Sequence, residues 1–171
     1  SQTFRDKYFA LPGDITNATA FWGATDSNPA TCIVTVGSGT QTCNGDGNGM
    51  VQTTAPGATH YSEAFTFWQH LGYSGLIEGT YTGRVGAGGG SEGTTSNSPQ
   101  SKYQRALWFP INWNATFTSS SMYDGSYREN FLQFGAFQAG GPPATPVVRA
   151  EEAWNIDTKL DDGKPAIGKV I

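Results

Sequence analysis

Charge is scarce in this sequence, and positive charge is not concentrated anywhere along it. Asp, Glu, Lys and Arg make up 14% of the 171 residues, and the formal net charge is −4. A nucleic-acid-binding surface needs clustered Lys and Arg side chains that neutralise phosphates, and no such cluster is present. The composition therefore argues against a nucleic-acid partner. Its many Gly, Ser, Thr and Asn residues are more typical of a protein that works outside the cytoplasm.

Long hydrophobic runs are missing as well. A membrane-spanning helix needs about 20 consecutive apolar residues, and the apolar runs here are far shorter. The chain begins at Ser1 within a helical pattern, because Phe4, Tyr8 and Leu11 recur at the spacing of one helix face. We therefore expect a further segment to precede Ser1.

Cysteine is limited to Cys32 and Cys43. Two cysteines that lie close together in a Gly- and Thr-rich stretch are typical of a local disulfide in an oxidising compartment. The alternative is a pair of unpaired thiols. Their spacing is too long for the Cys-x-x-Cys half of a zinc knuckle, so a two-cysteine metal site is not expected.

The motifs of common enzyme classes are absent too. There is no Gly-x-Ser-x-Gly elbow, and the only histidines, His60 and His70, do not form a zinc pattern. His70 falls inside a predicted helix, where a packing or capping role is expected. The adjacent pairs Glu151–Glu152 and Asp161–Asp162 point apart on a helix or turn, which makes them poor acid/base partners. We therefore expect no enzymatic activity.

The most informative stretch that is present is the loop from Cys43 to Val51. Oxygen-bearing side chains stand at alternate positions (Asn44, Asp46, Asn48), followed by Gly49 and then by an apolar residue. This is the spacing of the first half of an EF-hand calcium loop, in which alternate side chains point at one centre. Gly49 would supply the sharp turn, and the carbonyl of Met50 would be the next ligand. The pattern predicts a calcium site.

The loop departs from the full motif in two places. The first ligand is Asn44 instead of Asp, and Ala55 stands where a bidentate Glu belongs. One formal negative charge would bind calcium weakly, so a distant carboxylate must complete the site. Glu63 is the first candidate, followed by Asp161 and Asp162. Two alternatives stay open: a Gly/Asn turn without metal, and a Glu63 that only complements its helix dipole.

Apolar periodicity and turn signals predict a mixture of helices and short strands within one domain, 1–171. The clearest helix is 62–76, with Phe65, Trp68 and Leu71 on its apolar face. Ala153, Ile156 and Leu160 are expected to face the core from the last helix, for which Thr145 would be the N-cap and Pro146 the first residue. The remaining expected elements are a helix over 1–11, a helix over 14–22 capped by Asp14, strands at 31–36, 105–111 and 130–137, and a hairpin signal at Asp124–Gly125.

Three groups of stretches together resemble a known family. They are Phe4–Asp14 with Asn17–Thr19 and Trp22–Gly23; Cys43–Gly49 with Trp68–Leu71 and Gly75–Gly79; and Ile156–Pro165 with Gly168. This combination resembles bacterial type IV pilins and type II secretion pseudopilins, the class with a prepilin-type N-terminal cleavage and methylation segment. The defining hydrophobic helix of that class would lie directly before Ser1.

The resemblance implies an α+β fold in which an N-terminal helix packs on a small antiparallel sheet, with long loops. It implies a subunit that is anchored in the bacterial inner membrane by the preceding helix, assembles with other pilin or pseudopilin subunits into a filament, and keeps its globular part in the periplasm or at the cell surface. Calcium in a loop near the sheet is also implied, and here that loop holds Asn44, Asp46 and Asn48.

A second interpretation is a secreted, calcium-dependent binding or adhesion module. Trp113, Tyr123 and the Gly-rich loop at 86–90 would form its binding surface. The sequence upstream of Ser1 separates the two hypotheses, because a filament subunit has an apolar helix of about 20 residues there and a secreted module has a cleavable signal peptide.

Overall fold

The computed structural model describes residues 2–25, 41–52, 63–112, 130–164 and 168–170. The chain forms two compact units. Unit 1 is Ser1–Asn112 with Asn130–Thr145, and unit 2 is Trp113–Glu129 with Pro146–Ile171. The single domain expected from the sequence stays a prediction.

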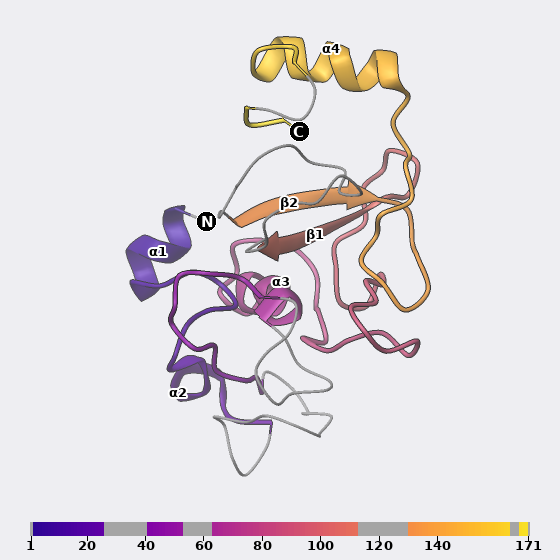
Figure 1. Ribbon diagram of the computed structural model, residues 1–171. Helices are drawn as coiled ribbons and strands as arrows, with labels where there is room; N and C mark the ends of the chain where they lie inside the picture. Colours follow the sequence, from indigo (N-terminus) through magenta and orange to yellow (C-terminus); the bar gives the residue numbers. More distant parts are fainter. Residues whose placement is uncertain (1, 26–40, 53–62, 113–129, 165–167, 171) are drawn as a thin grey trace. The chain divides into compact units, whose positions relative to one another are not determined.

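In the ranges that the structure describes, the regular elements are helices and two short strands, so the coarse α+β class is confirmed (Figure 1). Among the described residues, unit 1 holds three helices and an antiparallel pair of strands, and unit 2 holds one helix. The elements are α1 (Gln2–Tyr8), α2 (Ala18–Trp22), α3 (Glu63–Tyr73), β1 (Leu107–Asn112), β2 (Asn130–Gly135) and α4 (Ala150–Leu160).

Helix α3 is the centre of unit 1, and its apolar face is the one that the sequence predicted. Phe65, Trp68 and Leu71 are all buried. They contribute to two core clusters, of which cluster 1 also contains Phe4 of α1 and cluster 2 also contains Phe109 of β1. The members of cluster 1 are Phe4, Trp68, Leu71 and Tyr81, and those of cluster 2 are Val51, Ala64, Phe65 and Phe109.

The sheet packs against α3 through β1. Strands β1 and β2 are antiparallel, from Leu107 opposite Gly135 to Asn112 opposite Asn130. Both strands were predicted, with ends that differ by up to two residues. The rings of Phe109 and Phe65 meet edge to face with centroids 5.4 Å apart, an arrangement that aromatic pairs prefer. The helix packed on the sheet is thus α3, while α1 packs on α3 through the fully buried Phe4.

The end of the first helix and the start of the second were predicted incorrectly. Helix α1 ends at Tyr8 instead of Leu11, because Phe9 adopts a left-handed φ of 55° that a right-handed helix does not allow. Helix α2 begins at Ala18 after the N-cap Asn17, so Asp14 is not its cap. Its predicted end is confirmed, since Gly23 is the C-cap.

The prediction for helix α4 was wrong in its start and in its apolar face. Thr145 does not cap it, because the Thr145 carbonyl accepts the Ala136 N–H at 2.9 Å. The helix begins four residues after Pro146, where the Glu152 carboxylate accepts the N–H of Arg149, its N-cap. The residues expected to face the core, Ala153, Ile156 and Leu160, are all exposed.

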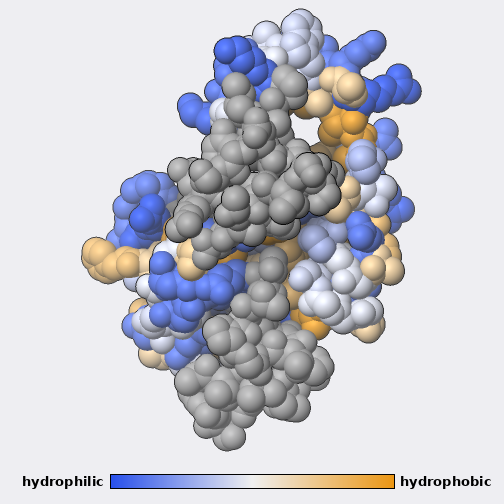
Figure 2. Space-filling model, viewed as in Figure 1, coloured by the Kyte–Doolittle hydropathy of each residue, from blue (hydrophilic) through white to orange (hydrophobic). Residues whose placement is uncertain are grey.

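Two predicted features, the strand at 31–36 and the hairpin signal at Asp124–Gly125, lie outside the described residues. Within the described ranges, no helix combines the length and apolar composition that crossing a membrane requires. Helix α1 exposes Arg5, Asp6 and Lys7, and the surface over it is largely hydrophilic (Figure 2).

Candidate metal centre

The loop that carries the calcium pattern is tightly bent and lies against the turn that follows α1. Gly49 has φ +84°, which confirms its predicted role as the sharp turn. Val51 is buried in cluster 2 and fastens the end of the loop to the core. A Cβ added at Gly45 would lie 2.4 Å from the Asp14 Cα and from the Gly13 carbonyl oxygen. The loop can therefore approach Asp14 only because residue 45 is glycine.

Asp14 is the side chain around which the loop is wrapped. Its Oδ1 accepts the backbone N–H groups of Gly47 at 2.7 Å and Asn48 at 3.0 Å, and its Oδ2 accepts that of Gly49 at 2.9 Å. Only 4% of the residue is exposed. Since charge-assisted hydrogen bonds from backbone N–H groups are strong, Asp14 fixes the conformation of the loop.

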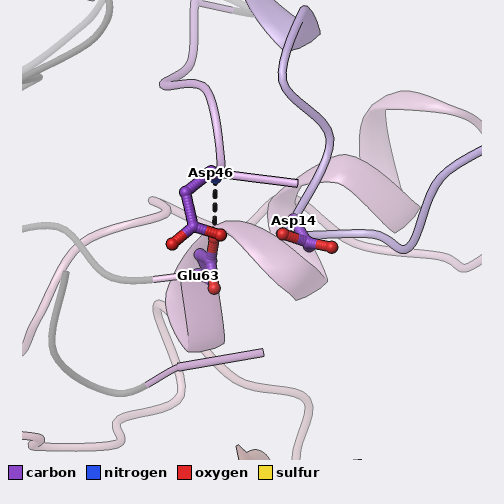
Figure 3. Close-up of side chains that lie close together, drawn as sticks. All are labelled: Asp14, Asp46 and Glu63. Atoms are coloured by element: carbon purple, nitrogen blue, oxygen red, sulfur yellow. Dashed lines mark hydrogen bonds between the residues drawn. The ribbon is translucent and has the colours of Figure 1, made fainter. Parts of the chain in front are cut away.

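Glu63 holds the same loop from the first turn of α3. Its Oε1 accepts the N–H of Asp46 at 2.9 Å, and its Oε2 accepts that of Gln52 at 3.0 Å. The chain is thereby tied to the start of α3 at two points six residues apart. Figure 3 shows the Asp46 bond and the approach of the Asp14, Asp46 and Glu63 side chains from three separate segments.

We call Asp14, Asp46 and Glu63 the loop triad. One carboxylate oxygen from each residue lies within 4.8 Å of the other two. Asp14 and Glu63 are buried, and Asp46 is exposed. Burial raises the pKa of Glu63 to about 7, and the charges of Asp46 and Asp14 add to the rise, although the Asp46 and Gln52 N–H groups oppose it. Burial also raises the pKa of Asp14, against the lowering effect of the Gly49 and Gly47 N–H groups.

The sequence therefore named two members of the triad and missed the third. Asp46 and Glu63 were candidate ligands, and the structure brings them together. Asp14 was interpreted as a helix cap. Two sequence features could have drawn attention to Asp14: it is an acidic residue in a chain with few charges, and it follows a Pro–Gly turn. No local pattern indicated that it reaches a loop 33 residues further on.

The two asparagines of the pattern direct their side-chain oxygens to backbone groups. Asn44 Oδ1 accepts the N–H of Thr19 in the first turn of α2 at 3.0 Å. Asn48 Oδ1 accepts the N–H of Met50 at 2.8 Å, which is a turn that Asn side chains commonly form. The predicted set Asn44, Asp46, Asn48 and Met50 thus shapes the loop through side chain–backbone bonds.

Asn130 connects the loop to the sheet, and the sequence did not indicate it. At the start of β2, its Oδ1 accepts the N–H of Val51 at 2.7 Å and its Nδ2 donates to the carbonyl of Gly49 at 2.8 Å. The amide thus pairs with the loop as a neighbouring strand would. Asn112 of β1 also donates to Asn130 Oδ1 at 3.1 Å, so both strands support the loop.

The triad fits a hard, oxygen-preferring cation. A carboxylate offers about four lone-pair sites. Asp14 uses three of them for N–H groups and Glu63 uses two, so ligand positions remain on both. An all-oxygen set with buried like charges suits Ca²⁺. The metal-free alternative also stays open, because the N–H bonds by themselves hold the loop.

His70 has the packing role that was expected of it. It is fully buried on α3, where its Nδ1 accepts the N–H of Gly13 at 3.0 Å and its Nε2 lies 2.9 Å from Thr42 Oγ1. Burial lowers the pKa of His70 to about 3, so the ring is neutral at physiological pH. Its accepting nitrogen holds the Gly13–Asp14 turn in position beside the loop.

The remaining predicted site residues are more scattered. Cys43 is disulfide-bonded, and Cys32, the other cysteine of the sequence, lies outside the described residues. Asp161 and Asp162 belong to unit 2, where they gather with Asp157. Ala55, Trp113 and Tyr123 also lie outside the described residues.

Comparisons with protein-family models, with curated proteins and with solved structures found no match for this chain.

Proposed function

We propose that this chain is the globular part of a non-enzymatic filament subunit, a pilin or pseudopilin of a type IV pilus or type II secretion system. The observation that carries the proposal is the meeting of stretches from the first two groups on which the resemblance rests. These are the stretches 12–14, 43–49 and 68–71, which are distant in sequence and contact one another around α3.

The contacts between these stretches are direct. The N–H of Gly13 is held by His70, and the N–H of Gly45 donates to the carbonyl of Ile15 at 2.9 Å. A Cβ at Gly13, which has φ +87°, would lie 2.4 Å from the Glu63 carbonyl oxygen. The motifs thus form one packed frame that joins α1 to α3, as a head mounted on an N-terminal helix requires.

The proposed subunit would be anchored in the inner membrane by an apolar helix that continues upstream of α1. Filament growth would then pack those helices against one another and leave the globular part in the periplasm or at the cell surface. Partners in this account are other pilin or pseudopilin subunits. The hydrophilic exposed side of α1 is compatible with a solvated connection between the anchor and the frame.

Calcium is part of the proposal. The loop triad would hold Ca²⁺ through its free carboxylate lone pairs, and the ion would neutralise like charges that are otherwise buried together. A bound ion would stiffen the loop and the frame to which Glu63 and Asp14 tie it. The contribution of the ion would be structural and not catalytic.

Expression of the complete coding sequence tests the filament role. Expressed together with a prepilin peptidase, the product is expected to lose a short leader, gain an N-terminal methyl group and keep an apolar helix before Ser1, which intact-mass measurement detects. A cleavable signal peptide and no membrane-bound form would contradict the proposal and favour the secreted, calcium-dependent binding module.

A further inference from the structure

The end of helix α4 in unit 2 has an unusual distribution of polar and apolar side chains. Trp154, Ile156 and Leu160 are exposed, whereas the only buried residue of the helix is the acidic Asp157. Only 5% of Asp157 is exposed. An ionised carboxylate is among the most costly groups to bury without a partner, so the burial of Asp157 requires an explanation.

Asp157 lies against two further carboxylates. One oxygen from each of Asp157, Asp161 and Asp162 lies within 4.8 Å of the other two. Asp157 and Asp161 stand four residues apart and therefore share a helix face, where like charges repel. All three are at the C-terminal end of α4, where the helix dipole disfavours negative charge. Nothing in the geometry of the helix itself stabilises this group.

Hydrogen bonds within unit 2 leave part of the group unsatisfied. Asp161 Oδ2 accepts the backbone N–H groups of Lys169 and Val170, and Asp162 Oδ1 accepts that of Lys164 at 2.9 Å. Buried Asp157 Oδ1, in contrast, has no hydrogen-bond partner. Buried polar atoms nearly always have a partner, and a bound ion is one explanation for such an orphan that also accounts for the neighbouring carboxylates.

We propose that Asp157, Asp161 and Asp162 form a divalent-cation site that is separate from the loop triad. Three carboxylates offer only hard oxygen ligands, and an irregular set drawn from a helix end and the following turn suits Ca²⁺ better than Mg²⁺, which demands an octahedron. Because Asp161 also binds the N–H groups of Lys169 and Val170, the ion would fasten residues 168–170 to the end of α4. This inference does not rest on the filament role.

The packing of residues 168–170 against Asp161 supports a fixed arrangement at the end of α4. A Cβ at Gly168, which has φ +89°, would overlap the Asp161 carboxylate, so a larger residue there would displace that side chain. Gly163, with φ +72°, turns the chain after α4, and a Cβ on it would lie 3.6 Å from Trp154 Nε1. The Trp154 ring therefore lies near the acidic group and can report on it.

Calcium titration of the full chain by calorimetry tests the site, in an Asp46→Asn background that weakens the loop triad. The expected result is one bound Ca²⁺ whose affinity falls about tenfold or more in Asp157→Asn, because changes beyond the direct ligands already cost that much. Glu151→Gln, which removes an exposed carboxylate from the first turn of α4, is the matched control and should change nothing.

Terbium supplies a second, local readout. Tb³⁺ emission excited through tryptophan should be lost in Trp154→Phe while calcium affinity stays the same, and added Ca²⁺ should quench it in the parent protein.

If Asp157→Asn does not fold, as circular dichroism would reveal, Asp162→Asn replaces it, because Asp162 is exposed. Equal calcium binding in the parent and in the Asp157→Asn or Asp162→Asn variant, or no binding in the Asp46→Asn background, would overturn the proposal.

Discussion

At the residue scale, Asp14 accounts for more of the loop conformation than any residue of the motif itself. It accepts three backbone N–H groups while nearly buried. Replacing one of its oxygens by an amide would turn a donor toward at least one N–H group and leave that group unsatisfied. The loop would then lose the contact that closes it.

Asp14→Asn is expected to lower the free energy of unfolding by about 1–3 kcal/mol, the usual cost of a buried donor left without an acceptor. Urea denaturation measures the change. Asp6→Asn on the exposed side of α1 is the control and should stay within about 0.5 kcal/mol. Equal stabilities for the two variants would show that the N–H bonds to Asp14 do not hold the loop.

His70 and Glu63 should affect acid stability in opposite directions. The pKa of His70 falls to about 3 in the folded protein, so its contribution to stability is complete above its unfolded pKa of 6.5 and is lost as the pH drops below it. The pKa of Glu63 rises to about 7, so its contribution is complete below 4.5 and is lost as the pH increases toward 7. Between pH 4.5 and 6.5 the two slopes oppose each other.

The expected result for metal-free protein is a nearly flat stability curve from those two residues between pH 4.5 and 6.5, with a fall below pH 4.5. In His70→Asn, whose amide oxygen can still accept the Gly13 N–H, stability should instead rise as the pH drops from 6.5 to 4.5. Urea unfolding over a pH series measures both curves. A His70 ring that titrates near pH 6.5 in the folded protein by NMR would contradict this account.

At the element scale, α3 joins α1, α2 and β1 in unit 1. Its Phe65 packs edge to face on Phe109 of β1, and its Trp68 and Leu71 pack on Phe4 of α1. The helix also presents Glu63 to the loop at its first residue. A defect in the packing of α3 should therefore weaken the sheet contact and the loop together.

Phe65→Ala is expected to cost about 3–5 kcal/mol, since it removes a fully buried ring and leaves a cavity. Leu132→Ala on β2, where the side chain is 48% exposed, should cost about 1 kcal/mol or less. Thermal and urea unfolding compare the two. A similar cost for both would place the core elsewhere than between α3 and β1.

Gly45 tests the contact between the loop and the turn after α1. In Gly45→Ala the new Cβ would overlap the backbone of Asp14, so the loop must move away and the triad must open. Gly89→Ala is the matched control, because its Cβ would meet nothing within 4 Å, although its φ of +76° makes the change mildly unfavourable. Calorimetry should find calcium binding at the triad lost in the first variant and kept in the second.

At the scale of the whole molecule, the local parts of the fold were the predictable ones. The apolar stripe of α3 and the pair of strands follow from periodicity within short windows, and both were found. Helix ends were missed where a single backbone angle decided them, as at Phe9. The apolar pattern of α4 predicted a core face, yet that face is exposed, because periodicity reports amphipathicity and not what covers it.

The candidate site was only half predictable for a related reason. Loop spacing and a charge argument indicated Asp46 and Glu63, which are within 20 residues of each other. Asp14 and Asn130 reach the loop from 33 and 79 residues away in contacts that no local pattern encodes. The fold brings distant segments together, and it thereby forms a cluster of three carboxylates that the motif alone does not supply.

The most direct test of the central claim is the melting temperature of the purified domain in EDTA, in Ca²⁺ and in Mg²⁺, measured in an Asp157→Asn background so that only the loop triad responds. The account predicts a calcium-specific rise of several degrees, equivalent to about 1 kcal/mol or more, and its loss when Asp46→Asn is added. An unchanged melting temperature in all three conditions would contradict a calcium site and reduce the triad to a metal-free clamp on the loop.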